Sequence, residues 1–216
     1  MSTTAEFAYH SIRKKLFQGG LVSGQRVSQV QIARELGCST VPVVEALRRL
    51  ESDGLLIKEP RKMAKVRVLV AAEVKGLYLL RQALEMTAIE LCIQAIEDQE
   101  IEQLEQLEQQ FEQAAADRDV TRATQFDMEI HRFIVRCARC PLFQEELDRL
   151  MLIERTVPGE PLEENRWKRY GQSHRRIIEA IVDRDQEVGQ VLMKKHIQNG
   201  YEETLERIRR SSRMPD

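Results

Sequence analysis

Helical periodicity over residues 73–209 is the feature that most constrains how this chain can fold. Throughout this stretch, apolar residues recur every three or four positions, and no segment shows a convincing strand pattern. Few glycines and prolines interrupt it, since the 216-residue chain holds only 10 and 6 of them. Six helices joined by short links are typical of an antiparallel bundle, whose core can house a metal or ligand site. We expect four of them at residues 72–96, 100–116, 119–140 and 142–155, and two more that carry His174 and His196.

Two short helices joined by a tight turn are predicted in the first third of the chain. Ser28 can cap the first helix, Gln31 three residues later completes a capping box, and Gly37 ends the helix. Ser39 or Thr40 then caps the second helix, which carries its own apolar stripe. Two helices with so short a connection are typical of a helix-turn-helix.

A small β wing is expected to follow. Residues 55–59 and 65–70 read as two strands, the second with valines at every other position. Together with an amphipathic segment over residues 7–17, these elements predict a winged helix-turn-helix domain. The chain is therefore expected to be mostly α, with this domain over residues 1–70 and an all-helical antiparallel six-helix bundle over residues 71–216.

Charge divides at the same boundary. Residues 1–70 carry 12 Lys and Arg against 6 Asp and Glu, whereas the remainder carries 21 against 29. A basic segment on an acidic body points to a polyanion partner for the basic segment alone. Its cations fall on the second helix and the wing, where side chains contact phosphate while the helix N-terminus enters the major groove of DNA. They are Arg48, Arg49, Arg61, Lys62 and Lys65. The alternative is a small α+β domain that does not bind nucleic acid.

One aspartate and three of the four histidines have spacings that suit a metal ion. Asp127 and His131 are four residues apart, so on a helix both project from one face. His174 and His196 lie in later segments with helical periodicity. Neutral imidazoles and one carboxylate are accepted ligands of divalent first-row metals. The alternative is a polar cluster in the core.

The sequence has no apolar run near the ~20 residues that span a bilayer and no signal peptide pattern at its start. We therefore expect a cytoplasmic protein without a membrane partner, and its four cysteines reduced. Cys137 and Cys140 form a CxxC, but no second CxxC accompanies it, so a structural zinc site there is not expected.

The chain resembles the GntR family of bacterial transcription regulators. The stretch VSQVQIARELGCSTVPVVEALRRLESDGLL follows that family's helix-turn-helix. The body resembles the FCD ligand-binding domain of the FadR subgroup, in its six-helix variety, through LRQALEMTAIELC, FDMEIHRFIV and SHRRIIEAIVDRDQEVGQVLMKKHI. The resemblance covers about residues 8–200.

This resemblance implies a homodimeric repressor or activator that binds a palindromic operator in double-stranded DNA. A small carboxylic-acid effector would modulate it from the body's cavity. Asp127, His131, His174 and His196 match the FCD metal ligands for a divalent transition metal, with zinc expected first and nickel or manganese as alternatives. Arg81 matches an arginine that faces the cavity and can bind an effector carboxylate. The alternative for Arg81 is an ion pair with Glu85 or Glu90 on its own helix.

The head departs from the family pattern at three positions. Thr40 and Val44 stand where the family usually has arginines, and Met63 replaces the usual wing glycine, although it resists a positive φ. Ser39 and Thr40 can still hydrogen-bond to DNA, and Val41 or Val44 can contact a thymine methyl group. We therefore expect an operator different from the family's common one.

Two other functions fit the same residues. A metal-dependent hydrolase would use the ion to activate water, but four protein ligands fill much of the coordination shell and no general base is clearly placed. A metal-sensing regulator would respond to the ion itself, and the sequence does not distinguish it from a metal that anchors a metabolite.

Overall fold

The computed structural model describes residues 3–58, 62–157 and 165–211. The chain divides into two compact units. The N-terminal unit comprises Met1–Val70 with Met151–Pro158, and the C-terminal unit comprises Ala71–Leu150 with Gly159–Asp216. The segment 151–158 therefore groups with the N-terminal unit, although it follows most of the bundle in sequence.

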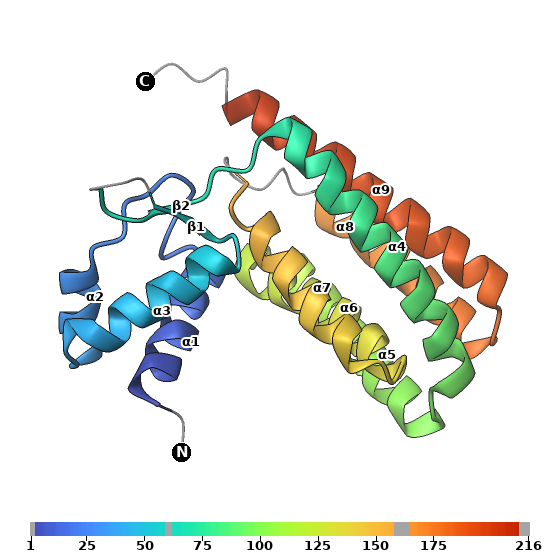
Figure 1. Cartoon of the computed structure of the whole chain (residues 1–216). Coiled ribbons are helices and arrows are strands. Elements are labelled where there is room, and N and C mark those ends of the chain that lie inside the picture. The colour runs from blue at the N-terminus through green and yellow to red at the C-terminus, as the bar shows by residue number, and fades with distance from the viewer. Residues whose placement is uncertain (1–2, 59–61, 158–164, 212–216) are drawn as a thin grey trace. The chain divides into compact units, whose positions relative to one another are not determined.

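In the described part of residues 1–70, the N-terminal unit has three helices and a two-stranded antiparallel sheet (Figure 1). The sheet pairs Leu56 with Val66 and Ile57 with Lys65. The elements are α1 (Thr4–Phe17), α2 (Gln29–Leu36), α3 (Thr40–Ser52), β1 (Leu56–Ile57) and β2 (Lys65–Val66). The predicted winged helix-turn-helix is thus confirmed.

The turn between α2 and α3 depends on local capping. Ser28 accepts a hydrogen bond from the backbone N–H of Gln31 at 3.3 Å. The side chain of Gln31 donates to Glu35 instead of completing the predicted capping box. Gly37 ends α2 at φ 64°, a left-handed conformation that glycine adopts without steric cost. Ser39 is the N-cap of α3, but its side chain makes no capping bond.

The predicted wing strands were too long. Each strand has two residues, and the alternation expected through Val68 and Val70 is wrong, because both are exposed while Leu69 is buried. The backbone N–H of Leu69 donates to the carbonyl of Thr156 at 3.2 Å. The chain therefore leaves the sheet after Val66 to bond with a segment that is distant in sequence.

Six helices form the described part of the helical body, as predicted, with bounds within a few residues of those expected. Helix α4 packs on α9 and α6, α5 packs on α6 and α8, and α8 packs on α9 (Figure 1). The helices are α4 (Ala71–Ala95), α5 (Asp98–Ala116), α6 (Val120–Cys137), α7 (Pro141–Glu154), α8 (Asn165–Val182) and α9 (Gln186–Ser211). No helix in the described ranges is long and apolar enough to cross a bilayer.

Apolar side chains fill most of the space between these helices. Ile89 of α4, Phe111 of α5, Ile134 of α6 and Ile181 of α8 are all at most 1% exposed. A smaller group of polar side chains is buried within the same unit. Burial of polar groups is costly unless they are paired or bound to a ligand, so this group marks the candidate site.

Candidate functional site

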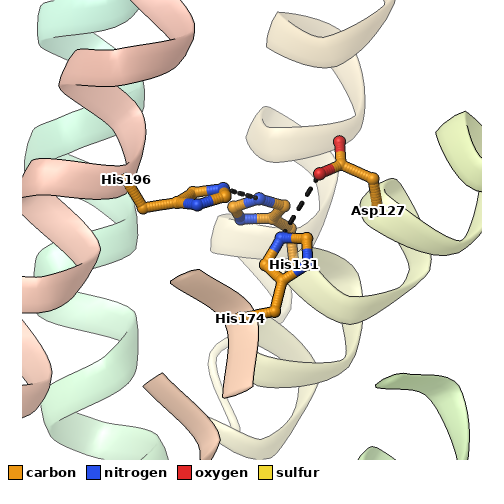
Figure 2. Close-up of side chains that lie close together, drawn as sticks. All are labelled: Asp127, His131, His174 and His196. Atoms are coloured by element: carbon orange, nitrogen blue, oxygen red, sulfur yellow. Dashed lines mark hydrogen bonds and ion pairs between the residues drawn. The ribbon is translucent and has the colours of Figure 1, made fainter. Parts of the chain in front are cut away.

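The four residues expected to bind metal come together inside the C-terminal unit. Figure 2 shows Asp127 and His131 projecting from α6, with His174 of α8 and His196 of α9 turned toward them. One ligand atom from each residue lies within 4.8 Å of the corresponding atoms of the others. His131 Nε2 is 3.0 Å from His196 Nε2, and His174 Nε2 is 3.3 Å from Asp127 Oδ1.

Helical geometry explains why these side chains meet. Asp119 caps α6 by accepting the backbone N–H of Arg122 at 3.0 Å, which sets where the helix begins. Asp127 and His131 then lie one turn apart. His131 is flanked by buried Ile130 and Ile134, so it lies on the buried side of the helix. His174 likewise lies on the buried side of α8, near the buried Ile177. His196 lies on the buried side of α9, beside the buried Ile197.

Two of the imidazoles are oriented by partners on their outer side. His131 Nδ1 is hydrogen-bonded to the carboxylate of Glu85, and His196 Nδ1 lies 3.0 Å from Ser173 Oγ. With Nδ1 engaged outward, both rings turn Nε2 to the centre of the cluster. Such outer partners are usual for metal-binding histidines, because they fix the tautomer that leaves the inner nitrogen free for the ion.

Burial and charge set the protonation of these groups. Burial lowers the pKa of His174, and it lowers the pKa of His196 much further, with the neighbouring imidazoles adding to the effect. Burial also disfavours charge on His131, but the carboxylate of Glu85 outweighs it and raises the pKa of His131. Burial would raise the pKa of Asp127, yet its contact with His174 and the other imidazoles holds it below the usual range. The arrangement therefore favours an ionised aspartate beside neutral His174 and His196, which are the ligand forms.

The donor set fits a divalent transition metal. Among buried side-chain atoms of the described residues, Asp127 Oδ1 and both ring nitrogens of His174 have no hydrogen-bond partner. Two ligand atoms at ~2.0–2.1 Å from one tetrahedral ion lie ~3.3 Å apart, close to the 3.0 and 3.3 Å separations in the cluster. An ion at the centre would satisfy the atoms that the protein leaves without partners.

Arg81 is buried on α4 and forms the contact expected as the alternative to effector binding. Its Nε donates to Glu85 Oε1 at 2.8 Å, and the residue is 7% exposed. Glu90 accepts a hydrogen bond from Gln190 at 2.7 Å. The effector role of Arg81 stays a prediction. Glu85 was considered only as an ion-pair partner, although its spacing from Arg81 already places it on the same helix face.

The residues predicted to bind DNA lie on two elements of the N-terminal unit. Ser39, Thr40 and Val41 are exposed at the start of α3, where Val41 is 73% exposed. Val44, Arg48, Lys58, Lys62 and Met63 are among the residues that line one groove between α2, α3 and the wing. Lys58 lines the same groove but was not among the predicted DNA contacts, because a lone lysine at a strand end has no distinctive pattern.

Three other predicted contacts have different surroundings. The guanidinium of Arg49 lies 4.0 Å over the ring of Tyr9, which turns it toward α1. Lys65 is half-buried and lies on β2. Arg61 is outside the described residues.

Comparison with known proteins identifies the class that has this fold and site. Residues 76–199 match the FCD domain family, and residues 4–66 match the family described as bacterial regulatory proteins, gntR family. The chain belongs to the GntR family of bacterial regulatory proteins and carries an FCD domain. The members of these families and the relatives below are transcriptional regulators and not enzymes, so the hydrolase alternative is set aside.

Relatives agree with this assignment. The HTH-type transcriptional regulator YdhC of Bacillus subtilis (strain 168) is 36% identical over 93 residues, which cover 43% of this chain and 42% of YdhC. The Nta operon transcriptional regulator of Aminobacter aminovorans is 29% identical over 192 residues, or 86% of this chain and 87% of that protein. The matches to YdhC and to a regulator of Agrobacterium vitis span less than half of those relatives.

Solved structures share the fold. The E. coli McbR/YncC structure superposes with a TM-score of 0.86 at 21% identity and covers 95% of this chain and 99% of that one. A GntR regulator from Rhodococcus sp. RHA1 gives a TM-score of 0.79 at 19% identity, with 94% and 97% coverage.

Proposed function

We propose that the C-terminal unit binds one divalent transition metal through Asp127, His131, His174 and His196, with zinc the first expectation and nickel or manganese as alternatives. The observation that carries this proposal is the convergence of three buried imidazoles and one carboxylate, several of whose atoms have no other partner. FCD domains can bind metal, which supports the same assignment.

The regulator would respond to a small carboxylic-acid effector at this centre. When bound, the metal supplies a Lewis-acidic anchor for a carboxylate. A pocket of about 350 Å³ reaches His196 and Ser173 between α8 and α9 and also contains Tyr170 and Asn199. His196 is the cluster residue that borders this pocket, whose lining also includes Glu202, Glu203 and Glu206. Arg81 is one of the few buried cations among the described residues. Its guanidinium would supply a charge-assisted hydrogen bond to the carboxylate of the effector.

The ion itself is the second candidate signal. In the structure Arg81 is already paired with Glu85, so the guanidinium expected to bind an effector carboxylate is engaged within the protein. This contact favours a metal-sensing regulator in which Arg81 and Glu85 serve the histidine cluster and no metabolite is needed.

The unit over residues 1–70 would bind DNA, and the body over residues 71–216 would bind the effector and hold two copies together. Two-fold operators mirror two-fold proteins, so we infer a homodimer on a palindromic site. Leu79 and Leu80, 55% and 58% exposed on α4, are candidates for the dimer seam.

The test of the metal site is the metal content of the purified regulator and three variants. Wild-type protein is expected to hold about one divalent ion per chain. His174→Ala should bind the metal far more weakly than wild type. The loss of affinity should exceed the roughly 10–100-fold that follows removal of an outer partner. His10→Ala is the matched control, since His10 is exposed on α1. Arg81→Gln should keep the metal, because an amide can still donate to Glu85.

Operator binding then separates the two candidate signals. If a carboxylate is the effector, metal-loaded wild type should change its operator affinity only when small carboxylic acids are added, and Arg81→Gln should weaken that response. If the ion is the signal, adding metal alone should change the affinity. Wild-type protein that holds no metal and takes up none when it is added back would leave the four residues as a polar core cluster and overturn the proposal.

A further inference from the structure

Glu108 on α5 is a buried carboxylate that the fold alone does not explain. The residue is 6% exposed, and both of its carboxylate oxygens are without a hydrogen-bond partner among the described residues. A buried polar group in this state costs free energy, so its retention calls for a specific role. Across the helix interface, Nδ1 of His174 lies 3.9 Å from Glu108 Oε2.

The position of Glu108 completes a pattern around the histidine cluster. His131 has Glu85 at its Nδ1, and His196 has Ser173 at its Nδ1. His174 turns Nε2 toward Asp127, which leaves its Nδ1 on the side of Glu108. Each of the three imidazoles thus has an oxygen on its outer side and the cluster on its inner side.

Packing limits what else could hold the His174 ring. Phe111, one turn beyond Glu108 on α5, meets the imidazole edge-on with ring centroids 4.9 Å apart. Tyr170 approaches at 6.1 Å between centroids. These contacts fix the ring plane. Neither ring nitrogen of His174 has a hydrogen-bond partner among the described residues, and the carboxylate of Glu108 lies on the Nδ1 side at 3.9 Å.

Glu108 also borders a pocket between α5 and α8, which contains Glu105, Glu112 and Arg175. Its two oxygens are themselves buried, so they are not presented to a molecule in that pocket. Their surroundings therefore favour a role toward the bundle interior over a role as a ligand contact in the pocket.

We propose that Glu108 is a positioning residue for His174: it accepts the Nδ1 proton and holds the tautomer that presents Nε2 to a metal ion. This inference rests on the proposed metal site. The 3.9 Å separation must shorten by about 1 Å when the ion binds, to reach the usual ~2.7–2.9 Å of a charge-assisted hydrogen bond.

The test compares Glu108→Leu and Glu108→Gln with the matched control Glu105→Gln, an exposed glutamate on the same helix. Zinc affinity is measured by competition with a chromophoric chelator, in the full-length protein. Glu108→Leu should bind zinc about 10–100-fold more weakly than wild type. Glu108→Gln should lose less, because its amide oxygen still accepts the Nδ1 proton. Glu105→Gln should match wild type.

Two further measurements separate positioning from a merely structural role. The visible bands of the cobalt-substituted Glu108→Leu protein should differ from those of wild type, since His174 is no longer held in one orientation. The melting temperature of metal-free Glu108→Leu should equal or exceed that of metal-free wild type, because an unpartnered buried carboxylate has been removed. Unchanged zinc affinity and cobalt bands in Glu108→Leu would overturn the role of Glu108, and so would weaker binding accompanied by a lower metal-free melting temperature. Wild-type protein that binds no metal would instead overturn the proposed metal site.

Discussion

Identical side chains in the C-terminal unit ionise differently because their neighbours differ. Burial raises the pKa of Glu85, but the charges of Arg81 and His131 outweigh it and lower the value to about 2. Burial also raises the pKa of Glu108, and the nearby Glu112 adds to the effect, so the value is about 8. Arg81 and His131 therefore keep Glu85 a stable anion, whereas the positive charge of Arg175 near Glu108 does not offset its burial.

In the N-terminal unit, Tyr9 joins α1 to the end of α3 by one hydrogen bond. Its hydroxyl donates to Asp53 Oδ2 at 2.6 Å. Tyr9→Phe should therefore lower the free energy of unfolding by about 1 kcal/mol at pH 8. Burial first, and then the bond to Asp53, raise the pKa of Tyr9. A phenol with a raised folded-state pKa contributes fully below its unfolded pKa of about 10 and loses that contribution as the pH rises through the folded value.

The difference between wild type and Tyr9→Phe should accordingly shrink above about pH 10. Chemical denaturation of both full-length proteins, followed by circular dichroism from pH 8 to pH 11, measures it. A difference that stays constant over this range would show that the hydroxyl is not held as a proton donor.

At the scale of helices and strands, sequence periodicity predicted most elements because their signals are local. Gly37 and Asp119 marked helix ends that the structure has at the same residues. The second wing strand was predicted too long because Leu69 bonds to Thr156, a partner 87 positions away that no local pattern can reveal. Likewise, the spacing of Asp127 and His131 was visible on one helix. The positions of Ser173 and Glu108 relative to the cluster depend on how α8 packs on α9 and α5, so their roles could not be predicted.

Close packing of α9 on its neighbours makes Gly200 sensitive to substitution. A Cβ at this position would lie 3.2 Å from both Tyr170 Oη and Tyr78 Cε1. Overpacking of this kind costs about 1–3 kcal/mol, which exceeds the gain of about 0.5–1 kcal/mol from alanine in a helix. We therefore expect Gly200→Ala to destabilise the C-terminal unit.

Gly76→Ala is the matched control, because a Cβ on this α4 glycine would meet nothing within 4 Å. It should stabilise the same unit by about 0.5–1 kcal/mol. Urea denaturation of the metal-free proteins compares the two variants. Equal shifts in both variants would mean that α9 moves away from Tyr78 and Tyr170 without cost.

For the whole molecule, the division of charge predicts that only the N-terminal part of the chain attracts DNA phosphates. We expect the basic first 70 residues to attract DNA phosphates and the acidic remainder to repel them. We therefore expect specificity to come from base contacts at the start of α3, where Thr40 and Val41 are exposed.

A dimer with several phosphate contacts should lose operator affinity steeply with salt. The slope of log affinity against log salt concentration is expected to be on the order of −4 to −8. Lys62→Ala removes one contact from each copy, so the slope should become shallower by about 2, whichever DNA sequence is used. Lys194→Ala, on an exposed position of α9, should leave the slope unchanged. Val41→Ala should alter the preference among operator sequences and keep the slope, because it changes a base contact only.

Fluorescence anisotropy over a salt series measures the slopes, and light scattering at micromolar concentration measures the mass. A monomeric mass together with a slope about half as steep would show that each copy binds DNA alone and that the operator need not be palindromic.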